Sequence, residues 1–326
     1  MESTWRRDEL LPYRLGGLLY TPALNAGMAR KIKERVYPCL LSAAFCLEDS
    51  IQDAALPLAE QTLTRTLEEL AGTPDLPLLF VRVRTPRHLE RVHRLLGPLE
   101  ELLTGYILPK FDLSNGGEYA RLIKAFNETR TSGPLYMMPT LESGMIAEPG
   151  SRTSMLLRVK RILDSVRGHV LNVRVGGNDF CNLYGLRRSV RQSIYDIGVI
   201  RDILVDILQV FSADYVVSGP VWEYFGADPA GLWAEGLRRE LELDRLNGFT
   251  GKTAVHPTQL PIICQTMQVS AEDYEDARSI LGWSAGDYGV AKSAGGSRMN
   301  EVKCHAKWAE HVCKLAAVYG IREEEP

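Results

Sequence analysis

The sequence predicts an α/β fold of the (β/α)8, or TIM-barrel, class with a C-terminal extension made of a loop and a helix. Eight short apolar runs each end in a polar or charged residue, and longer segments of mixed polarity with helical spacing lie between them. Alternation of this kind indicates parallel strands joined by helices. The chain of 326 residues has room for one barrel of roughly 250 residues and an extension.

The eight predicted strands are spread over the first 260 residues. In order, the runs are GGLLYTPALN (16–25), LLSAAFCLEDS (40–50), PLLFVRVR (77–84), GYILPK (105–110), LYMMPTLESG (135–144), VLNVRVGGNDF (170–180), YVVSGPVWE (215–223) and KTAVHPTQL (252–260). The active site of such a barrel lies where the strands end. The residues that close each run are therefore the candidates for function.

Helices are predicted between the runs because apolar residues recur three and four apart. The clearest are ALPLAEQTLTRTLEELAG (55–72), PRHLERVHRLLGPLEELL (86–103) and GEYARLIKAFNET (117–129). We divide the chain into a loose polar lead-in (1–15), the barrel (16–260) and a C-terminal helical extension with a lid (261–326).

The pattern changes beyond residue 260. Ser270 predicts the start of a capped helix that ends near Leu281. The segment 282–299 is rich in Gly, Ser and Ala and predicts a mobile loop, and a last helix is expected from near Asn300 to just before Gly320. A loop followed by a helix beside a barrel is a common lid arrangement.

Composition and charge narrow the function. A formal net charge of -3 argues against nucleic acid or an anionic membrane as the main partner, and 45% hydrophobic residues are ordinary for a globular protein. No apolar stretch approaches the roughly 20 residues that span a bilayer. The start of the sequence lacks the apolar region of a signal peptide. We therefore expect a cytoplasmic protein.

Four zinc-type residues lie close together near the end of the chain: Cys304, His305, His311 and Cys313. On a single helix over 301–317, Cys304 and His311 share one stripe, whereas the other two point elsewhere. We therefore assign these residues packing roles.

Two carboxylates end the fifth and sixth predicted strands. Glu142 and Asp179 can converge at the barrel mouth, and two carboxylates with positions left for water and substrate suit Mg²⁺. A bound metal would act as a Lewis acid on a substrate carbonyl. The alternatives are a salt bridge at the rim for Glu142 and a helix N-cap for Asp179.

Two arginines end the third predicted strand. Arg82 and Arg84 are two residues apart and should share a face. An arginine fork binds carboxylate in a bidentate manner and stabilises an oxyanion, so we predict Arg82 as a catalytic residue and both as substrate contacts. The alternative is an internal ion pair.

Glu48, Asp49 and Lys110 close the second and fourth runs. The two acids could hold metal-bound waters, transfer protons or neutralise the cations. Lys110 could form a Schiff base with a ketone, although charge balance for the carboxylates is the simpler interpretation.

Further substrate contacts are assigned to Gly177, Asn178 and His256. The pair Gly176-Gly177 permits close backbone approach but forms neither a GxGxxG motif nor a P-loop. The simpler role for His256, which precedes a proline, is a structural hydrogen bond.

Taken in order, these motifs resemble the HpcH/HpaI aldolase and citrate lyase beta-subunit superfamily. LYTPALN is similar to its first-strand segment, LEDS (47–50) to its acidic strand-two motif, VRVR to its VRIN, ILPK to its LPK, LESG to its Glu-containing motif, GGNDF to its Asp-bearing strand-six motif, and GKTAVHPTQL to its GK-x-x-IHP-x-Q. The ordered succession covers most of the chain. The sequence of these motifs is most similar to a divergent branch of TIM-barrel C–C bond lyases that is found near tellurium-resistance genes and whose substrate is unsettled.

The resemblance implies Mg²⁺, with Mn²⁺ as an alternative, held by Glu142 and Asp179, and Arg82 facing a carboxylate or thioester oxygen. It implies a C–C bond lyase or aldolase that acts on a 2-oxo acid or acyl-CoA thioester through a metal-stabilised enolate. It also implies a homo-oligomer whose C-terminal lid completes the active site.

One departure affects the predicted chemistry. The lid of citrate lyase-like members carries a Met-Ile-Asp type motif with an acid–base Asp, whereas this chain reads Met299-Asn300-Glu301. Asn caps a helix about as well as Asp but takes no proton at neutral pH. Proton transfer is therefore assigned to Glu301 or to the pair of acids at 48 and 49. An acyl-CoA thioesterase at the same site and a catalytically degenerate, metabolite-binding barrel remain alternatives.

Overall fold

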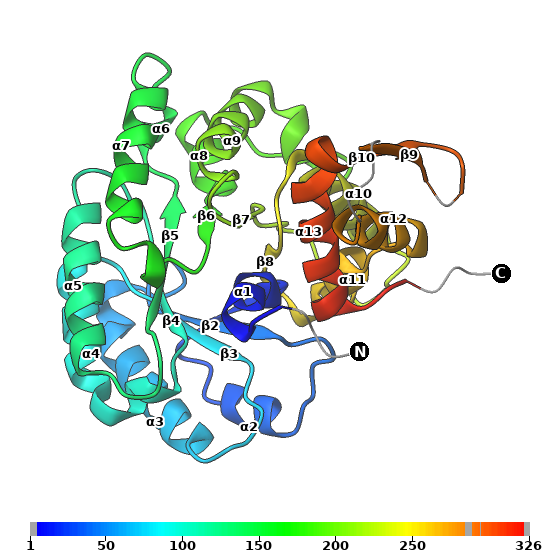
Figure 1. The fold of residues 1–326 in the computed structure, drawn as a ribbon. Helices are drawn as coiled ribbons and strands as arrows, with labels where there is room; N and C mark the ends of the chain where they lie inside the picture. Colours follow the sequence, from blue (N-terminus) through cyan, green and yellow to red (C-terminus); the bar gives the residue numbers. More distant parts are fainter. Residues whose placement is uncertain (1–4, 284–288, 294, 323–326) are drawn as a thin grey trace.

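Eight parallel strands form one sheet in the computed structural model, which describes residues 5–283, 289–293 and 295–322. The order β7-β6-β5-β4-β3-β2-β1-β8 makes neighbours of successive strands, and β1 pairs with both β2 and β8. A parallel bridge between Gly219 and Lys252 links the remaining two edges. The predicted TIM barrel is confirmed, with its helices on the outside (Figure 1).

Each of the eight apolar runs contains one barrel strand. The strands are β1 (Gly17–Pro22), β2 (Ser42–Cys46), β3 (Leu78–Arg82), β4 (Gly105–Leu108), β5 (Tyr136–Leu141), β6 (Val173–Val175), β7 (Val217–Ser218) and β8 (Lys252–Ala254). The helices that follow them are α2 (Met28–Lys33), α3 (Leu56–Leu70), α4 (Pro86–Leu96), α5 (Gly116–Thr129), α6 (Gly144–Ala147), α7 (Arg152–Asp164), α8 (Gly177–Leu183), α9 (Gly198–Phe211), α10 (Leu232–Asn247) and α11 (Leu260–Met267).

Alternation along the strands separates two hydrophobic cores. The larger core lies between strands and helices, and a small one contains Leu15, Leu18, Ala44, Phe80, Ile107, Met138 and Leu171. Because five of these come from five consecutive strands, the small core fills the barrel interior. Two residues further along β1, β3 and β5, and so on the same inward face, are Tyr20, Arg82 and Thr140. The interior is thus apolar at one end and polar at the carboxyl ends of the strands.

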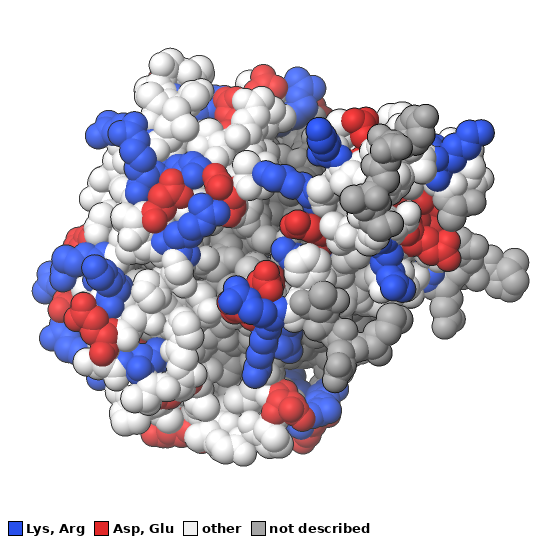
Figure 2. All heavy atoms as spheres, in the orientation of Figure 1, with Lys and Arg blue, Asp and Glu red and all other residues white. Residues whose placement is uncertain are grey.

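Charged side chains of both signs are present on the surface seen in Figure 2. On the face shown in Figure 2, Lys and Arg side chains are interspersed with Asp and Glu. Among the described residues, none of the helices has the length and apolar character needed to cross a bilayer.

The C-terminal extension contains more regular structure than the sequence predicted. Ser270 caps α12 (Ala271–Leu281) by accepting a hydrogen bond from the Asp273 amide, as predicted. The segment predicted as a mobile loop instead contributes an antiparallel pair, β9 (Val290–Lys292) and β10 (Met299–Glu301), while 284–288 and 294 lie outside the described residues. Asn300 is part of strand β10, so the last helix, α13 (Val302–Tyr319), begins at Val302 and not near Asn300 as predicted.

The buried stripe of α13 also differs from the prediction. It consists of Ala309, Val312, Leu315 and Tyr319, whereas Cys304 is exposed and the His305 ring accepts a hydrogen bond from the Glu301 amide. A packing role for Cys304 was therefore wrong. The first turn of α13 projects beyond the core that its later turns cover.

The described part of the N-terminal lead-in is folded rather than loose. Residues 7–15 form α1 (Arg7–Leu10) and a 3-10 turn, and Leu15 is buried in the barrel interior. The Tyr319 hydroxyl of α13 donates a hydrogen bond to the Tyr13 carbonyl, and the Tyr13 ring packs against His311. Residues 1–4 lie outside the described part. The division of the chain at 260 stays a prediction.

Candidate active site

A cavity of about 310 Å³ opens at the carboxyl ends of the barrel strands. Its wall is formed by side chains from β1, β3, β5, β6 and β8 and from the loops that follow them. The lining residues are Tyr20, Asp49, Arg82, Thr140, Glu142, Arg174, Val175, Gly176, Asn178, Asp179, Val221, Glu223, Thr253 and Val255. Five of the predicted site residues meet there: Asp49, Arg82, Glu142, Asn178 and Asp179.

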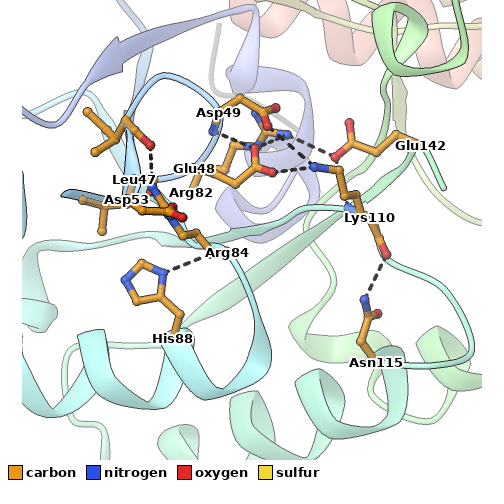
Figure 3. A network of polar contacts seen from close by, with 11 residues as sticks. Leu47, Glu48, Asp49, Asp53, Arg82, Arg84, His88, Lys110, Asn115 and Glu142 are labelled. Carbon is orange, nitrogen blue, oxygen red and sulfur yellow. Dashed lines mark hydrogen bonds and ion pairs between the residues drawn. The ribbon is translucent and has the colours of Figure 1, made fainter. Parts of the chain in front are cut away.

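Arg82, the last residue of β3, is the centre of an ion-pair network (Figure 3). Its Nη2 lies 2.9 Å from Glu48 Oε2 and 3.1 Å from Glu142 Oε1, and its Nη1 lies 3.1 Å from Asp49 Oδ2. The side chain is 9% exposed. Three carboxylates therefore hold one guanidinium in place and orient it at the edge of the cavity.

Lys110 joins the same network from the loop after β4. Its φ of 48° turns the backbone so that its amide donates to Glu142 Oε1 at 3.0 Å while its Nζ donates to Glu48 Oε1 at 2.8 Å. Burial lowers the pKa of the amine, but the bond to Glu48 and the charges of the nearby carboxylates together outweigh it, so the pKa lies above its usual value. The charge-balancing role fits this geometry, because a Schiff base requires the neutral amine.

Glu142 and Asp179 approach the cavity from neighbouring segments. Glu142 follows β5 and its side chain is only 2% exposed, and Asp179 lies in the first turn of α8 after β6. A Cβ on Gly176 would lie 2.1 Å from Glu142 Oε2, so only glycine at that position leaves room for the carboxylate. The ion pair considered for Glu142 is present, whereas the N-cap position of α8 is occupied by Gly176 and not by Asp179.

The electrostatics of the carboxylates follow from burial. Burial raises the pKa of Glu142 to about 8, with Arg82 opposing the rise and the Asp179 charge adding to it. Burial also raises the pKa of Glu48. It acts in the same direction on Asp49, but the bond to Glu48 and the charges of Arg82 and Lys110 bring the pKa of Asp49 below its usual value. The site thus holds more buried negative charge than its cations fully stabilise.

Arg84 does not line the cavity, and its side chain lies beside Leu47 and Asp53 (Figure 3). Because β3 ends at Arg82, the two arginines do not share a face as expected, and Arg84 binds the Leu47 and Ile51 carbonyls and the Asp53 carboxylate. It lines a larger, basic cavity of about 740 Å³ between α3 and α4. The geometry favours a role in holding the loop after β2.

Three other predicted residues also stand outside the cavity lining. His256 caps the turn before α11, bonding Thr258 and stacking on Phe225 with ring centres 4.4 Å apart. Gly177 is buried next to Pro220 in the first turn of α8. Glu301 ends β10, and its amide binds His305. Their assigned substrate and catalytic roles stay predictions.

Three of the residues that sequence reasoning missed come from the strands themselves. Tyr20, Thr140 and Arg174 line the cavity from within β1, β5 and β6, below the strand ends on which the prediction concentrated. For Arg174 the sequence held an indication. A charged residue inside the apolar run of a parallel strand has to find a polar environment.

The fold and the position of the cavity are those of a (β/α)8-barrel protein with a functional site at the strand ends. Parallel eight-stranded barrels carry out their chemistry at the carboxyl ends of the strands, where this chain gathers buried carboxylates and arginines.

A family model narrows this class. The model for C–C bond lyases of the TIM-barrel fold matches residues 9–321, and the chain belongs to that family. The resemblance to TIM-barrel C–C bond lyases is thereby confirmed.

Solved structures with the same fold include citrate lyases at low sequence identity. CitE from Mycobacterium tuberculosis, in complex with magnesium, acetoacetate and coenzyme A, has a TM-score of 0.60 and 20% identity over 93% of this chain and 99% of that chain. A citrate lyase from Burkholderia xenovorans LB400 has a TM-score of 0.69 and 15% identity, covering 95% and 94%. Malate synthase from Haloferax volcanii has a TM-score of 0.62 and 13% identity over 98% of this chain and 90% of that chain. Curated protein sequences gave no match.

Proposed function

We propose that the protein is a Mg²⁺-dependent carbon–carbon bond lyase or aldolase that acts on a 2-oxo acid or an acyl-CoA thioester. The observation that carries this proposal is the cavity at the strand ends, where Glu142 and Asp179 stand together beside the guanidinium of Arg82. The family match and the magnesium and coenzyme A in the CitE complex support it.

The carboxylates of the site fit a divalent cation. The pKa of Glu142 is raised by burial and by the charge of Asp179, so a cation between them would relieve both effects. In the described part of the chain, no three His, Cys, Asp or Glu side chains are grouped to hold a metal. Two protein carboxylates, with water and substrate in the other positions, suit Mg²⁺. When bound there, the ion would supply Lewis-acid polarisation of a substrate carbonyl.

The residues of the chain then have distinct tasks. Arg82 is preorganised by three carboxylates, so it needs no rearrangement to face an oxygen that gains negative charge. Lys110 and Glu48 hold that arginine and Glu142 in register. Asp49 is the one member of the predicted proton-transfer set, Glu48, Asp49 and Glu301, that lines the cavity, and its lowered pKa keeps it ionised, which a proton acceptor requires.

Deuterium exchange into the methyl group of pyruvate, followed by NMR, tests the proposal. Pyruvate is the smallest 2-oxo acid that enolises, so the assay needs no knowledge of the second carbon fragment. We expect exchange with Mg²⁺, none in EDTA, and parallel losses in Glu142→Gln and Asp179→Asn.

The matched control is Glu148→Gln. Glu148 is an exposed carboxylate after β5 that lies outside the cavity lining, so its removal should leave exchange unchanged. Exchange that persists in EDTA, or in Glu142→Gln, would contradict the proposal. Release of free thiol from an acyl-CoA without a second carbon product would instead favour the thioesterase.

A further inference from the structure

We propose that Arg174 determines substrate specificity by binding a second carboxylate of the 2-oxo acid, so that the preferred substrate is a dicarboxylic 2-oxo acid. The proposal rests on the function proposed above for the cavity. Its evidence, however, is the environment of one side chain and not the chemistry of the metal pair.

Arg174 is a buried cation with only neutral partners. It is 2% exposed, its Nη2 donates to Thr253 Oγ1 at 2.6 Å, and its Nη1 donates to Asn172 Oδ1 at 3.4 Å. Its Nε is buried without a hydrogen-bond partner. Within the described residues, no carboxylate lies at ion-pair distance from it.

The other buried arginines show that the lack of a carboxylate partner is unusual. The described residues include four buried arginines, at positions 82, 152, 174 and 188. Arg82 pairs with three carboxylates, Arg152 with Asp206 at 2.8 Å, and Arg188 with Glu240 at 3.4 Å. Arginine stays protonated in proteins, and an uncompensated buried charge destabilises the folded state. A missing anion is the simplest explanation for the exception.

Arg174 lines the cavity at a different point from the predicted metal pair. In the β5–β6 register Arg174 pairs with Thr140, and Thr140 precedes Glu142 by two residues. Arg174 therefore lies deeper in the barrel than Glu142. Its bond to Thr253 directs it towards β8, whereas Arg82 and its carboxylates lie on the side of β2 to β5. The buried hydroxyl of Thr140 is also without a partner.

Two separate cationic positions in one cavity fit a ligand with two acidic groups. The guanidinium fork binds a carboxylate in a bidentate manner, and the Thr140 hydroxyl can donate to the same group. One carboxylate of the substrate would face Arg82 and the metal pair. The other would reach Arg174 at the floor of the cavity.

Titration calorimetry with ligands of matched length tests this assignment. The probes are 2-oxoglutarate and 2-oxopentanoate, which share a five-carbon chain and differ in the second carboxylate. Wild type should bind the diacid tighter by about 10- to 100-fold, the range expected for a charge-assisted hydrogen bond. Arg174→Met should remove that preference and keep the affinity for 2-oxopentanoate, and Arg174→Lys should keep part of it.

Thermal unfolding separates this role from a structural one, and Arg152→Met is the matched control. Removing Arg152 leaves Asp206 unpaired and should lower the Tm, whereas removing Arg174 leaves no carboxylate unpaired and should not. Arg152→Met should also retain the preference for the diacid, because Arg152 is not part of the cavity lining.

Three results would overturn the proposal: equal affinities in wild type, a diacid preference that survives in Arg174→Met, or a fall in Tm as large as that of Arg152→Met. Titrations with and without Mg²⁺ distinguish this failure from failure of the lyase proposal. A diacid preference that depends on Arg174, found together with no pyruvate exchange, would support the carboxylate site and count against the lyase.

Discussion

Replacing Lys252 by Met tests how the barrel is held closed at its last strand. Lys252 begins β8 and its side chain is fully buried. Its Nζ donates to Glu240 Oε1 at 2.9 Å and to Asp244 Oδ2 at 2.6 Å, both on α10 and both buried. The Tyr195 hydroxyl donates to Asp244 and the Arg188 guanidinium lies 3.4 Å from Glu240.

The expected loss follows from what remains after the substitution. Methionine keeps most of the volume, so the main change is that Asp244 loses its cation and Glu240 keeps the more distant Arg188 as its cationic partner. Breaking a buried ion pair from one side costs about 3–5 kcal/mol. This is a large share of the roughly 5–15 kcal/mol that stabilise a folded protein.

Urea unfolding followed by circular dichroism gives the free energy of unfolding of each variant. The control is Arg201→Gln, which removes an exposed ion pair with Asp202 and should change the free energy by no more than about 1 kcal/mol. Neutralising both acids together with Lys252→Met should restore part of the stability. A loss below about 1 kcal/mol for Lys252→Met would refute the reasoning.

The remaining predictions concern the cavity and pH. Gly176→Ala would place a Cβ 2.4 Å from the Glu142 Cβ, so calorimetry should show Mg²⁺ affinity reduced about tenfold or more, and unchanged affinity would contradict the assigned ligand. Arg82→Lys should slow pyruvate exchange about 100-fold because one ammonium cannot replace the fork, and a rate near wild type would argue against that role. Burial and the charges of Lys314 and Arg245 lower the pKa of His311, so the unfolded chain binds more protons below pH about 6.5. The His311 contribution to stability should be complete above that pH and fall as the pH decreases, and urea unfolding of His311→Gln should show a smaller loss between pH 7.5 and 5.5 than wild type.

The location of the site was predictable from the order of the strands and from the barrel class. Apolar runs locate the parallel strands, and the barrel geometry places Arg82, Glu142 and Asp179 around one cavity. The sequence could not show that β3 ends at Arg82, so that Arg84 leaves the strand and binds the loop after β2. Only a strand two residues longer would have kept Arg84 on the face of Arg82.

Residues inside the strands were harder to foresee. Arg174 stands at an inward position of β6, but only the packed barrel shows that Thr253 and not a carboxylate faces it. The β9–β10 pair was missed because Gly- and Ser-rich sequence favours loops in isolation, whereas pairing with a second strand supplies the hydrogen bonds. Likewise, the helical turn at 7–10 packs against α13, a contact between distant segments that local sequence does not reveal.

The bond between Tyr319 and Tyr13 has a consequence for biosynthesis. The two residues are 306 positions apart in the sequence. Strand β1 likewise pairs with β8, which is synthesised much later. At about 5–20 residues per second, the first strand leaves the ribosome on the order of 15–60 s before its last partners are made. Until then Leu15 and Leu18 have no complete interior to enter, so the nascent chain presents an apolar edge that chaperones recognise. Loss of the last helix should therefore reduce the yield of folded protein more than its distance from the cavity suggests.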